Sequence, residues 1–310
     1  MWICAVMLVY KKIKKVRRGD NMKNPIIKGF YADPDVAVFD GKVYIYPTTD
    51  CENWTGTSFK VFSSEDLENW TDEGVILNLA DVPWSGGIRA WAPAIAEKNG
   101  RYYFYYTGNM RIGVAVSDSP TGPFVDKGSP LIEECAYEGS MIDPDVFVDD
   151  DGTAYLYWGN THLYVAKLSD DMLSLASEPK EVTPPDYSEA TCVFKRGDIY
   201  YYTWSCGDTR SPDYHIRYGK ATSPMEKPKG NTVILHRNFA EDKTVRGTGH
   251  HTILNIPGTD DWYIIYHRFN AEKYGDVEGY SDEAGCHREL CIDKMYFDEN
   301  GNILPVKPTN

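Results

Sequence analysis

The sequence predicts an all-β fold built from five repeated units, and three observations support this. Short tyrosine-rich runs recur at intervals of about 45 to 60 residues, and each follows a Gly or Asp turn. A second short apolar run precedes each turn, as in a hairpin. Helical periodicity is almost absent, apart from short turns such as "SSEDLENW" at 63–70. A strand–turn–strand unit repeated at this interval is typical of the blades of a β-propeller.

Each unit supplies two of the predicted strands. The first strands of the five units are "VAVF", "AIAE", "VFVD", "TCVF" and "TILNI". The tyrosine-rich runs that follow them are "GKVYIYPTT" (41–49), "GRYYFYYTG" (100–108), "GTAYLYWGN" (152–160), "GDIYYYTWS" (197–205) and "DDWYIIYHR" (260–268). We therefore predict a five-bladed β-propeller of four-stranded antiparallel blades around a central channel, in one domain at 22–310.

Residues 1–21 differ from the rest of the chain. The apolar stretch "MWICAVMLVY" is followed by the basic run "KKIKKVRR", whereas a signal peptide has its positive charges first. An apolar stretch of this length is also too short to span a bilayer. We expect 1–21 to be a non-native or disordered extension, and the protein to be cytoplasmic.

Charge and composition restrict the partners. The net charge of −14 argues against nucleic acid and against anionic membranes. The 23 tyrosines and 8 tryptophans suit both half-buried strands and surfaces that stack on sugars, so we expect a neutral ligand. The seven cysteines are scattered and form no CxxC pair, which favours free thiols in a reducing compartment.

When the units are aligned on their tyrosines, one position 11 to 13 residues upstream carries mostly ionisable side chains. The aligned tyrosines are Tyr44, Tyr103, Tyr155, Tyr200 and Tyr263. The upstream residues are Asp33, Trp91, Asp143, Glu189 and His250. The first strand of each propeller blade lines the axis, so equivalent positions at its start meet at one mouth of the channel. The alignment predicts a pocket with three carboxyl groups, a histidine and a tryptophan.

Such a pocket suits glycoside hydrolysis. One carboxylic acid protonates the leaving oxygen, and a carboxylate on the other side activates water in an inverting reaction. A third carboxylate nearby can raise the pKa of the acid and keep it protonated. The tryptophan offers an apolar platform for a sugar ring.

Other motifs are read as structural. Turn formation is the expected role of Asp35, Asp145 and the run Asp149, Asp150 and Asp151, because Asp often caps local backbone. The "DDDG" run lacks the downstream Glu of a calcium-binding loop. The sequence has no G-x-S-x-G elbow, no G-x-G-x-x-G and no P-loop, which argues against a serine hydrolase and against nucleotide cofactors.

Taken in order, several segments make the chain resemble glycoside hydrolase family 43 over about residues 24–307. These segments are "FYADPDVAVFDGKVYIY", "RAWAPAIAEKNGRYYFYYT", "SPTGPF", "IDPDVFVDDDGTAYLYWG", "SEATCVFKRGDIYYYTWS", "GTGHHTILNIPGTDDWYIIYHR" and "HRELCIDKMYFDENG". The resemblance implies a five-bladed propeller and an inverting enzyme that acts mainly on arabinose- and xylose-containing polymers. Two departures stand out. Ala190 and Thr191 follow Glu189 where many members have Gly-Pro. Ala94 follows "WAP" where members often have an acid, and we expect this replacement to alter the pocket wall.

The resemblance also implies roles for individual residues. Asp33 would be the general base, Asp143 the pKa modulator and Glu189 the general acid. Substrate-binding residues would be Trp91, Arg288 and His267. His250 would face a possible Ca²⁺ ion in the central channel that is held mostly by water, and no cofactor would be required for the chemistry.

We expect an exo-acting glycosidase that releases terminal α-L-arabinofuranosyl or β-D-xylosyl residues from hemicellulose-derived oligosaccharides. Alternatives within the same family are an endo-arabinanase and an exo-galactanase. Alternatives from other classes are a carbohydrate-binding propeller without catalysis and a propeller scaffold for protein partners. Loss of Asp33, Asp143 or Glu189 would favour the binding propeller, and the chain has all three.

Overall fold

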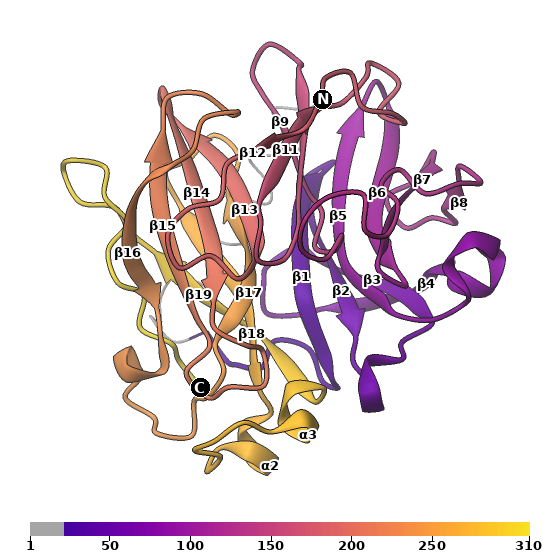
Figure 1. Ribbon diagram of the computed structural model, residues 1–310. Helices are drawn as coiled ribbons and strands as arrows, with labels where there is room; N and C mark the ends of the chain where they lie inside the picture. Colours follow the sequence, from indigo (N-terminus) through magenta and orange to yellow (C-terminus); the bar gives the residue numbers. More distant parts are fainter. Residues whose placement is uncertain (1–21) are drawn as a thin grey trace.

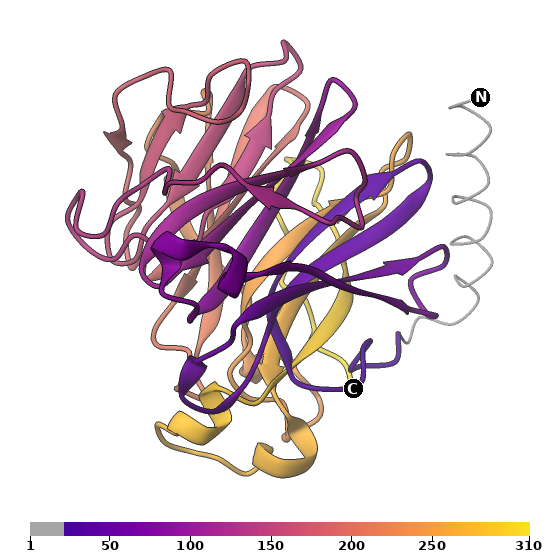
Figure 2. The ribbon, with the colours of Figure 1, turned by 90° about the vertical axis from the view of Figure 1, so that its right-hand side faces the viewer.

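The computed structural model describes residues 22–310, so the expectations about 1–21 lie outside the described residues. Five antiparallel sheets are arranged around a common axis, and Figures 1 and 2 show them from two sides. The innermost strands contact one another in the closed order β1–β5–β9–β13–β17. The predicted five-bladed propeller is confirmed. Within 22–310 no helix is both long and apolar enough to cross a membrane.

The blades follow one another along the chain, and the innermost strand comes first in each. Blade one consists of β1 (Tyr31–Phe39), β2 (Lys42–Thr49), β3 (Ser58–Ser64) and β4 (Thr71–Asn78). Blade two consists of β5 (Ala90–Lys98), β6 (Arg101–Gly108), β7 (Arg111–Ser117) and β8 (Val125–Asp126). Blade three consists of β9 (Asp145–Val148), β10 (Ala154–Trp158), β11 (Tyr164–Lys167) and β12 (Lys180–Glu181). Blade four consists of β13 (Glu189–Arg196), β14 (Ile199–Cys206), β15 (His215–Ala221) and β16 (Lys229–Leu235).

Blade five has three strands, β17 (Gly249–Asn255), β18 (Trp262–Phe269) and β19 (Arg288–Met295). The segment before β1 runs beside β19, where the Ile26 N–H donates to the Leu290 carbonyl over 2.9 Å. The start of the described chain is thus tied to the last blade. The short helices are η1 (Glu52–Trp54), η2 (Leu79–Asp81), η3 (Pro83–Ser85), η4 (Arg237–Phe239), α2 (Ala271–Tyr274) and α3 (Asp282–Gly285).

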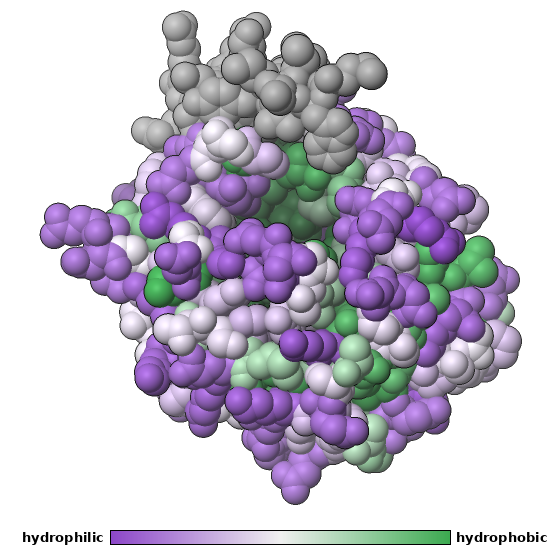
Figure 3. All heavy atoms as spheres, turned by 90° about the horizontal axis from the view of Figure 1, so that it is seen from above, coloured by the Kyte–Doolittle hydropathy of each residue, from purple (hydrophilic) through white to green (hydrophobic). Residues whose placement is uncertain are grey.

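The core is divided into five apolar clusters, each made by residues of two neighbouring blades. Tyrosines contribute to every cluster, and several keep their hydroxyl groups hydrogen-bonded while the rings are buried. Tyr46, Tyr105 and Tyr157 donate to backbone carbonyls over 2.7 to 2.8 Å. This packing explains the tyrosine-rich strands. Seen from above in Figure 3, the face opposite α2 and α3 is mostly hydrophilic, and apolar residues appear in a hollow near its centre.

One residue near the start of each innermost strand has a left-handed backbone conformation, with a positive φ angle. These residues are Asp33 (φ 48°), Ala92 (φ 39°), Asp143 (φ 55°), Ala190 (φ 58°) and His250 (φ 35°). In four blades a β-bulge accompanies this residue. Ala92 and Ala190 occupy the positions equivalent to Asp33, so Trp91 and Glu189 each lie one residue before the equivalent position. In blade four the tyrosine equivalent to Tyr44 is Tyr201, which pairs with Phe194, and not Tyr200.

The backbone N–H of the left-handed residue usually binds a side chain of the preceding blade. Ala92 donates to Thr48 over 2.7 Å, and Asp143 donates to Thr107 over 3.2 Å. His250 and Asp33 donate in the same way to Ser205 (2.9 Å) and His267 (3.3 Å). At the junction between blades three and four, the residue equivalent to these acceptors is Gly159, which has no side chain to accept a hydrogen bond. There the N–H of Ala190 hydrogen-bonds instead to the carboxyl group of Asp143.

The second aspartate of each "DPDV" phrase links blades, so its prediction as a turn residue is wrong. Asp35 accepts hydrogen bonds from the Ile95 N–H of blade two (2.7 Å) and the Thr252 hydroxyl of blade five (3.0 Å). Asp145 accepts from the Val193 N–H of blade four (2.9 Å). Both aspartates lie on innermost strands, where their carboxyl groups reach across the junction between blades. By contrast, Asp149, Asp150 and Asp151 do form the predicted turn before Gly152.

Ala94 occupies the position of Asp35 and Asp145 in blade two. It is 1% exposed within an apolar cluster and does not line the pocket described below. The expectation that it alters the pocket wall is therefore wrong. What the substitution removes is a side chain that could link blade two to blade three.

Replacing Asp35 with Asn should lower the melting temperature by several degrees at pH 5. A neutral carboxyl group keeps two acceptor oxygens for its three donors, whereas Asn keeps one, and an unsatisfied buried donor costs about 1–3 kcal/mol. Burial raises the pKa of Asp35 to about 6, although hydrogen bonds from Ile95, Val36 and Thr252 favour its charged form.

This raised pKa fixes the sign of the pH dependence. The folded state binds a proton that the unfolded state has released, so the stabilisation present at low pH is lost as the pH rises through about 6. The difference in melting temperature between wild type and Asp35→Asn should therefore narrow between pH 5 and pH 7.5. Asp150→Asn, at an exposed position, is the control, and the same shift in both variants would contradict a linking role for Asp35.

Candidate active site

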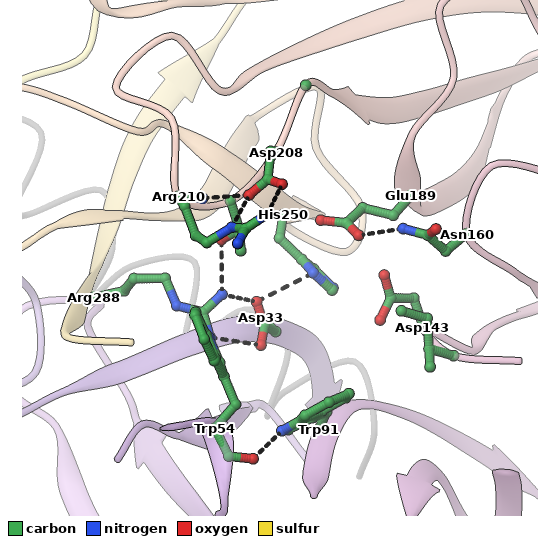
Figure 4. Close-up of a pocket in the computed structure, with 13 residues that line it drawn as sticks. Asp33, Trp54, Trp91, Asp143, Asn160, Glu189, Asp208, Arg210, His250 and Arg288 are labelled. Carbon is green, nitrogen blue, oxygen red and sulfur yellow. Dashed lines mark hydrogen bonds and ion pairs between the residues drawn. The ribbon is translucent and has the colours of Figure 1, made fainter. Parts of the chain in front are cut away.

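One pocket lies at the end of the channel where the innermost strands begin (Figure 4). It is lined by Asp33, Trp54, Trp91, Ile142, Asp143, Asn160, Glu189, Gly207, Asp208, Thr209, Arg210, His250 and Arg288. The five residues that the repeat alignment selected all belong to this lining. The predicted convergence of three carboxyl groups, a histidine and a tryptophan is thus seen in the structure.

Asp33 is a buried carboxylate surrounded by nitrogen atoms. Arg288 donates from Nη1 to Oδ1 over 2.7 Å and from Nη2 to Oδ2 over 3.2 Å. Oδ1 also lies 3.2 Å from Nδ1 of His250 and 3.1 Å from Nδ1 of His267. Burial alone would raise the pKa of Asp33, but Arg288 and the two histidines hold it well below its ordinary value. Asp33 is therefore ionised and suited to accept a proton.

Arg288 is held in place from its other edge by Asp50, which follows β2. Asp50 accepts from Nε of Arg288 over 2.9 Å and from Nη2 over 2.6 Å. The Nη1 group also lies 3.3 Å from the hydroxyl of Thr209. With donors directed at Asp50, Asp33 and Thr209, the guanidinium group fixes the orientation of Asp33 in addition to facing the pocket.

Glu189, the first residue of β13, lies across the pocket from the Asp33–Arg288 pair (Figure 4). Its two oxygens accept from the Tyr214 hydroxyl and from the Asn160 amide, each over 2.7 Å. Burial raises the pKa of Glu189, even though these two hydrogen bonds favour the charged form. Glu189 can thus carry a proton at a pH at which Asp33 has lost its own.

Asp143 lies beside Glu189 and is 7% exposed. Burial and then the negative charges of Glu189 and Asp33 raise its pKa well above the ordinary value. Its Oδ2 atom is buried and has no hydrogen-bond partner. Asp143 is thus a buried carboxyl group beside the partly buried Glu189, and the charge of Glu189 opposes its ionisation.

Two tryptophans form another wall of the pocket (Figure 4). The indole N–H of Trp91 donates to the backbone carbonyl of Trp54 over 2.8 Å. The indole N–H of Trp54 donates in turn to the Gly285 carbonyl over 3.1 Å. Since their polar atoms are engaged by the protein, the rings are held as apolar surfaces, which suits contact with the C–H groups of a sugar.

Comparison with known sequences decides the family. A sequence model of the glycosyl hydrolases of family 43 matches residues 22–303. The chain belongs to this family. It is 38% identical to a β-D-galactofuranosidase of Aspergillus niger over 92% of this chain and 85% of the relative. It is 31% identical to a xylosidase/arabinosidase of Humicola insolens over 92% of this chain and 99% of the relative.

Solved structures of family 43 enzymes share the fold. A β-xylosidase/α-arabinofuranosidase from a compost microbial metagenome, in complex with xylotriose and in a calcium-free form, has a TM-score of 0.78 and 29% identity. The alignment covers 94% of this chain and 99% of that one. An α-L-arabinofuranosidase from Clostridium thermocellum has a TM-score of 0.73 and 31% identity, over 90% and 94% of the two chains. The chain is a family 43 glycoside hydrolase.

The histidines of this family 43 site differ in their positions. His250 faces the pocket, whereas His267 is fully buried behind Asp33 and does not line the pocket. Its position suits support of Asp33 better than direct contact with a sugar. Burial lowers the pKa of both histidines to about 4, so both are neutral near pH 7.

A channel ion would find few protein ligands near His250. Within 22–310 no group of three or more His, Cys, Asp or Glu side chains is arranged to hold a metal ion. A neutral His250 whose Nδ1 faces Asp33 keeps its Nε2 available for one bond. The residues therefore fit an ion bound by one imidazole and otherwise by water.

Several site residues were missed because the repeat pattern does not point to them. They are Asp50, Trp54, Asn160, Asp208, Thr209, Arg210 and Tyr214. Most follow the second strand of a blade and lie in the connection to the third, where unit lengths differ. Asn160 and Asp50 did carry a usable signal, because Asn160 ends one tyrosine-rich run and Asp50 directly follows another.

Proposed function

We propose that this chain is an inverting exo-glycosidase that releases terminal α-L-arabinofuranosyl or β-D-xylosyl residues from hemicellulose-derived oligosaccharides. The observation that carries the proposal is the unequal charge of two carboxyl groups in one pocket. Asp33 is held ionised by Arg288, and Glu189 has a raised pKa. That inequality is what an acid–base pair requires.

In the proposed reaction Asp33 removes a proton from a water molecule that attacks the anomeric carbon. Glu189 donates its proton to the leaving oxygen as the glycosidic bond breaks. Asp143 and Glu189 lie close enough that the charge of one opposes ionisation of the other, so the pair holds a proton for the reaction, and Arg288 keeps Asp33 in place. Trp91 supplies a surface for the sugar that is released.

The relatives support the sugar class and also suggest a second candidate. Xylosidase/arabinosidases of Humicola insolens and Bacteroides ovatus are 31% and 33% identical to this chain. The 38% identity to a β-D-galactofuranosidase favours β-D-galactofuranosides as an alternative substrate. The ring of β-D-galactofuranose has the same arrangement of hydroxyl groups as that of α-L-arabinofuranose, and the sugars differ in the exocyclic carbon chain.

We further propose that the chemistry needs no cofactor. A Ca²⁺ ion beside His250, if bound, would add fixed positive charge at the end of the channel and orient its water ligands. All proton transfers of the proposed reaction are assigned to Asp33 and Glu189.

A panel of p-nitrophenyl glycosides tests the substrate class. Hydrolysis of the α-L-arabinofuranoside or the β-D-xyloside should be the fastest, with the β-D-galactofuranoside as the competing candidate and debranched arabinan as the test for endo action. Proton NMR of the first sugar released then tests the stereochemistry. An inverted anomer supports Asp33 as the base, whereas a retained anomer would refute it.

A further inference from the structure

We propose that Arg210 and Tyr280 form a subsite for the leaving group, which binds the second sugar of a neutral oligosaccharide at the rim of the pocket. This inference rests on the proposed function and adds to it the place where the remainder of the substrate lies.

Arg210 is a fixed part of the rim. It lines the pocket, and Asp208 binds its guanidinium group through Nε–Oδ1 (2.8 Å) and Nη2–Oδ2 (2.6 Å). Asp282 of α3 accepts from Nη1 over 3.3 Å. Gly285 permits this approach, because a Cβ atom there would lie 2.8 Å from Cγ of Arg210. The side chain is therefore held in one orientation before any ligand arrives.

The charge of Arg210 is already balanced at this rim. Asp208 and Asp282 supply two negative charges beside one guanidinium group. An acidic sugar would meet these carboxylates, whereas a neutral sugar can accept hydrogen bonds from the remaining donor capacity of Arg210 and stack on its plane. The local charge therefore favours xylose, arabinose or galactose over a uronic acid.

Tyr280 continues the rim into solvent. Tyr280 is 71% exposed, the largest exposed fraction among the large hydrophobic residues of 22–310, and its ring centroid lies 5.9 Å from Cζ of Arg210. The next residue, Ser281, donates its N–H to the Arg210 carbonyl over 2.9 Å, which ties the two segments together. An aromatic ring held beside a sugar pocket and not used in the core is a suitable stacking surface.

The position of the acids indicates which part of the substrate reaches this rim. Asp33 and Asp143 are 5% and 7% exposed, so the sugar that is cleaved lies at the buried end of the pocket. The rest of an oligosaccharide must leave through the less buried part of the lining, which includes Arg210. Tyr280 lies next along that path.

The test compares substrates with and without a second sugar ring. Tyr280→Ala should lower kcat/KM for xylotriose or arabinotriose by about 5- to 30-fold, the size expected for one stacking contact. Hydrolysis of the matching methyl glycoside, which has no second ring, should change less than about twofold. Tyr280→Phe should retain wild-type activity on the trisaccharide, because it keeps the ring.

Tyr296→Ala is a matched control. Tyr296 is 52% exposed, and Nζ of Lys294 lies 5.3 Å from its ring centroid, so its setting resembles that of Tyr280. It does not belong to the segments that form the rim. An active wild type whose ratio of trisaccharide to methyl glycoside activity is unchanged by Tyr280→Ala would overturn the subsite. Failure of the proposed function would be distinct, because the wild type would hydrolyse neither substrate.

Discussion

Glu189→Gln should reduce kcat by about 10²- to 10⁴-fold on a glycoside with a poor leaving group, and far less on an activated aryl glycoside. A sugar hydroxyl cannot leave without a proton, whereas p-nitrophenolate is stable without one. Gln has the shape of the acid and can still meet the Tyr214 hydroxyl and Asn160, so the fold should be kept. The measurement is kcat for a series of leaving groups of increasing pKa, in which the variant should show the steeper dependence.

The pH profile gives a second readout for Glu189. The wild type needs Glu189 protonated, so its activity should fall as the pH rises through the raised pKa of this group. That alkaline decline should be absent from Glu189→Gln measured on the activated substrate. Equal small losses on all leaving groups, with an unchanged pH profile, would remove Glu189 from the role of acid.

Asp33→Asn should lower kcat by about 10³-fold or more on every substrate, whatever its leaving group. The amide keeps the size of the side chain but cannot take a proton from water. Asn also tolerates the left-handed backbone of this position (φ 48°) better than Ala does. KM should change much less than kcat, because the base is assigned to the water and not to the sugar.

Asp33→Gly tests the same assignment by chemical rescue. Gly suits the left-handed backbone and leaves space beside Arg288, whose positive charge would attract an anion. Added azide should restore activity on an aryl glycoside and yield a glycosyl azide of inverted configuration. Rescue that gave a retained configuration would show that Asp33 is not the base, and Glu189→Gly treated in the same way is the control.

The repeat explains how much of the site the sequence could predict. Asp33, Asp143 and Glu189 were found because equivalent positions of a ring of strands meet at one end of its channel. The alignment nevertheless placed Trp91 and Glu189 one residue out of register, because spacing alone does not show which residue of each strand has the left-handed backbone or which tyrosine pairs with that strand. Asp35 and Asp145 were read as turn residues because Asp-Pro and Asp-Val fit turns locally. Their links form only when two blades lie side by side.

Site residues outside the repeated strands could not be predicted from the alignment of the repeats. Asp50 acts through Arg288, which is far away in sequence, and Tyr214 reaches Glu189 from a connection of irregular length. Arg210 and Tyr280 are brought together by the hydrogen bonds that Ser281 and Asp282 make with Arg210, between segments far apart in the sequence. Such contacts depend on tertiary structure and leave no pattern of spacing along the chain.

The alanine at position 94 changes how two neighbouring blades are held together. Asp35 and Asp145 occupy equivalent positions in the innermost strands, which form one layer of the propeller. In this layer, hydrogen bonds of Asp35 link blade one to blades two and five, and a hydrogen bond of Asp145 links blade three to blade four. Ala94 has no polar side-chain atom, so it makes no such hydrogen bond between blades two and three. In this layer the junction between blades two and three, which lies between Trp91 and Asp143, is therefore held by the apolar cluster that Ala94 joins and not by a buried carboxyl group.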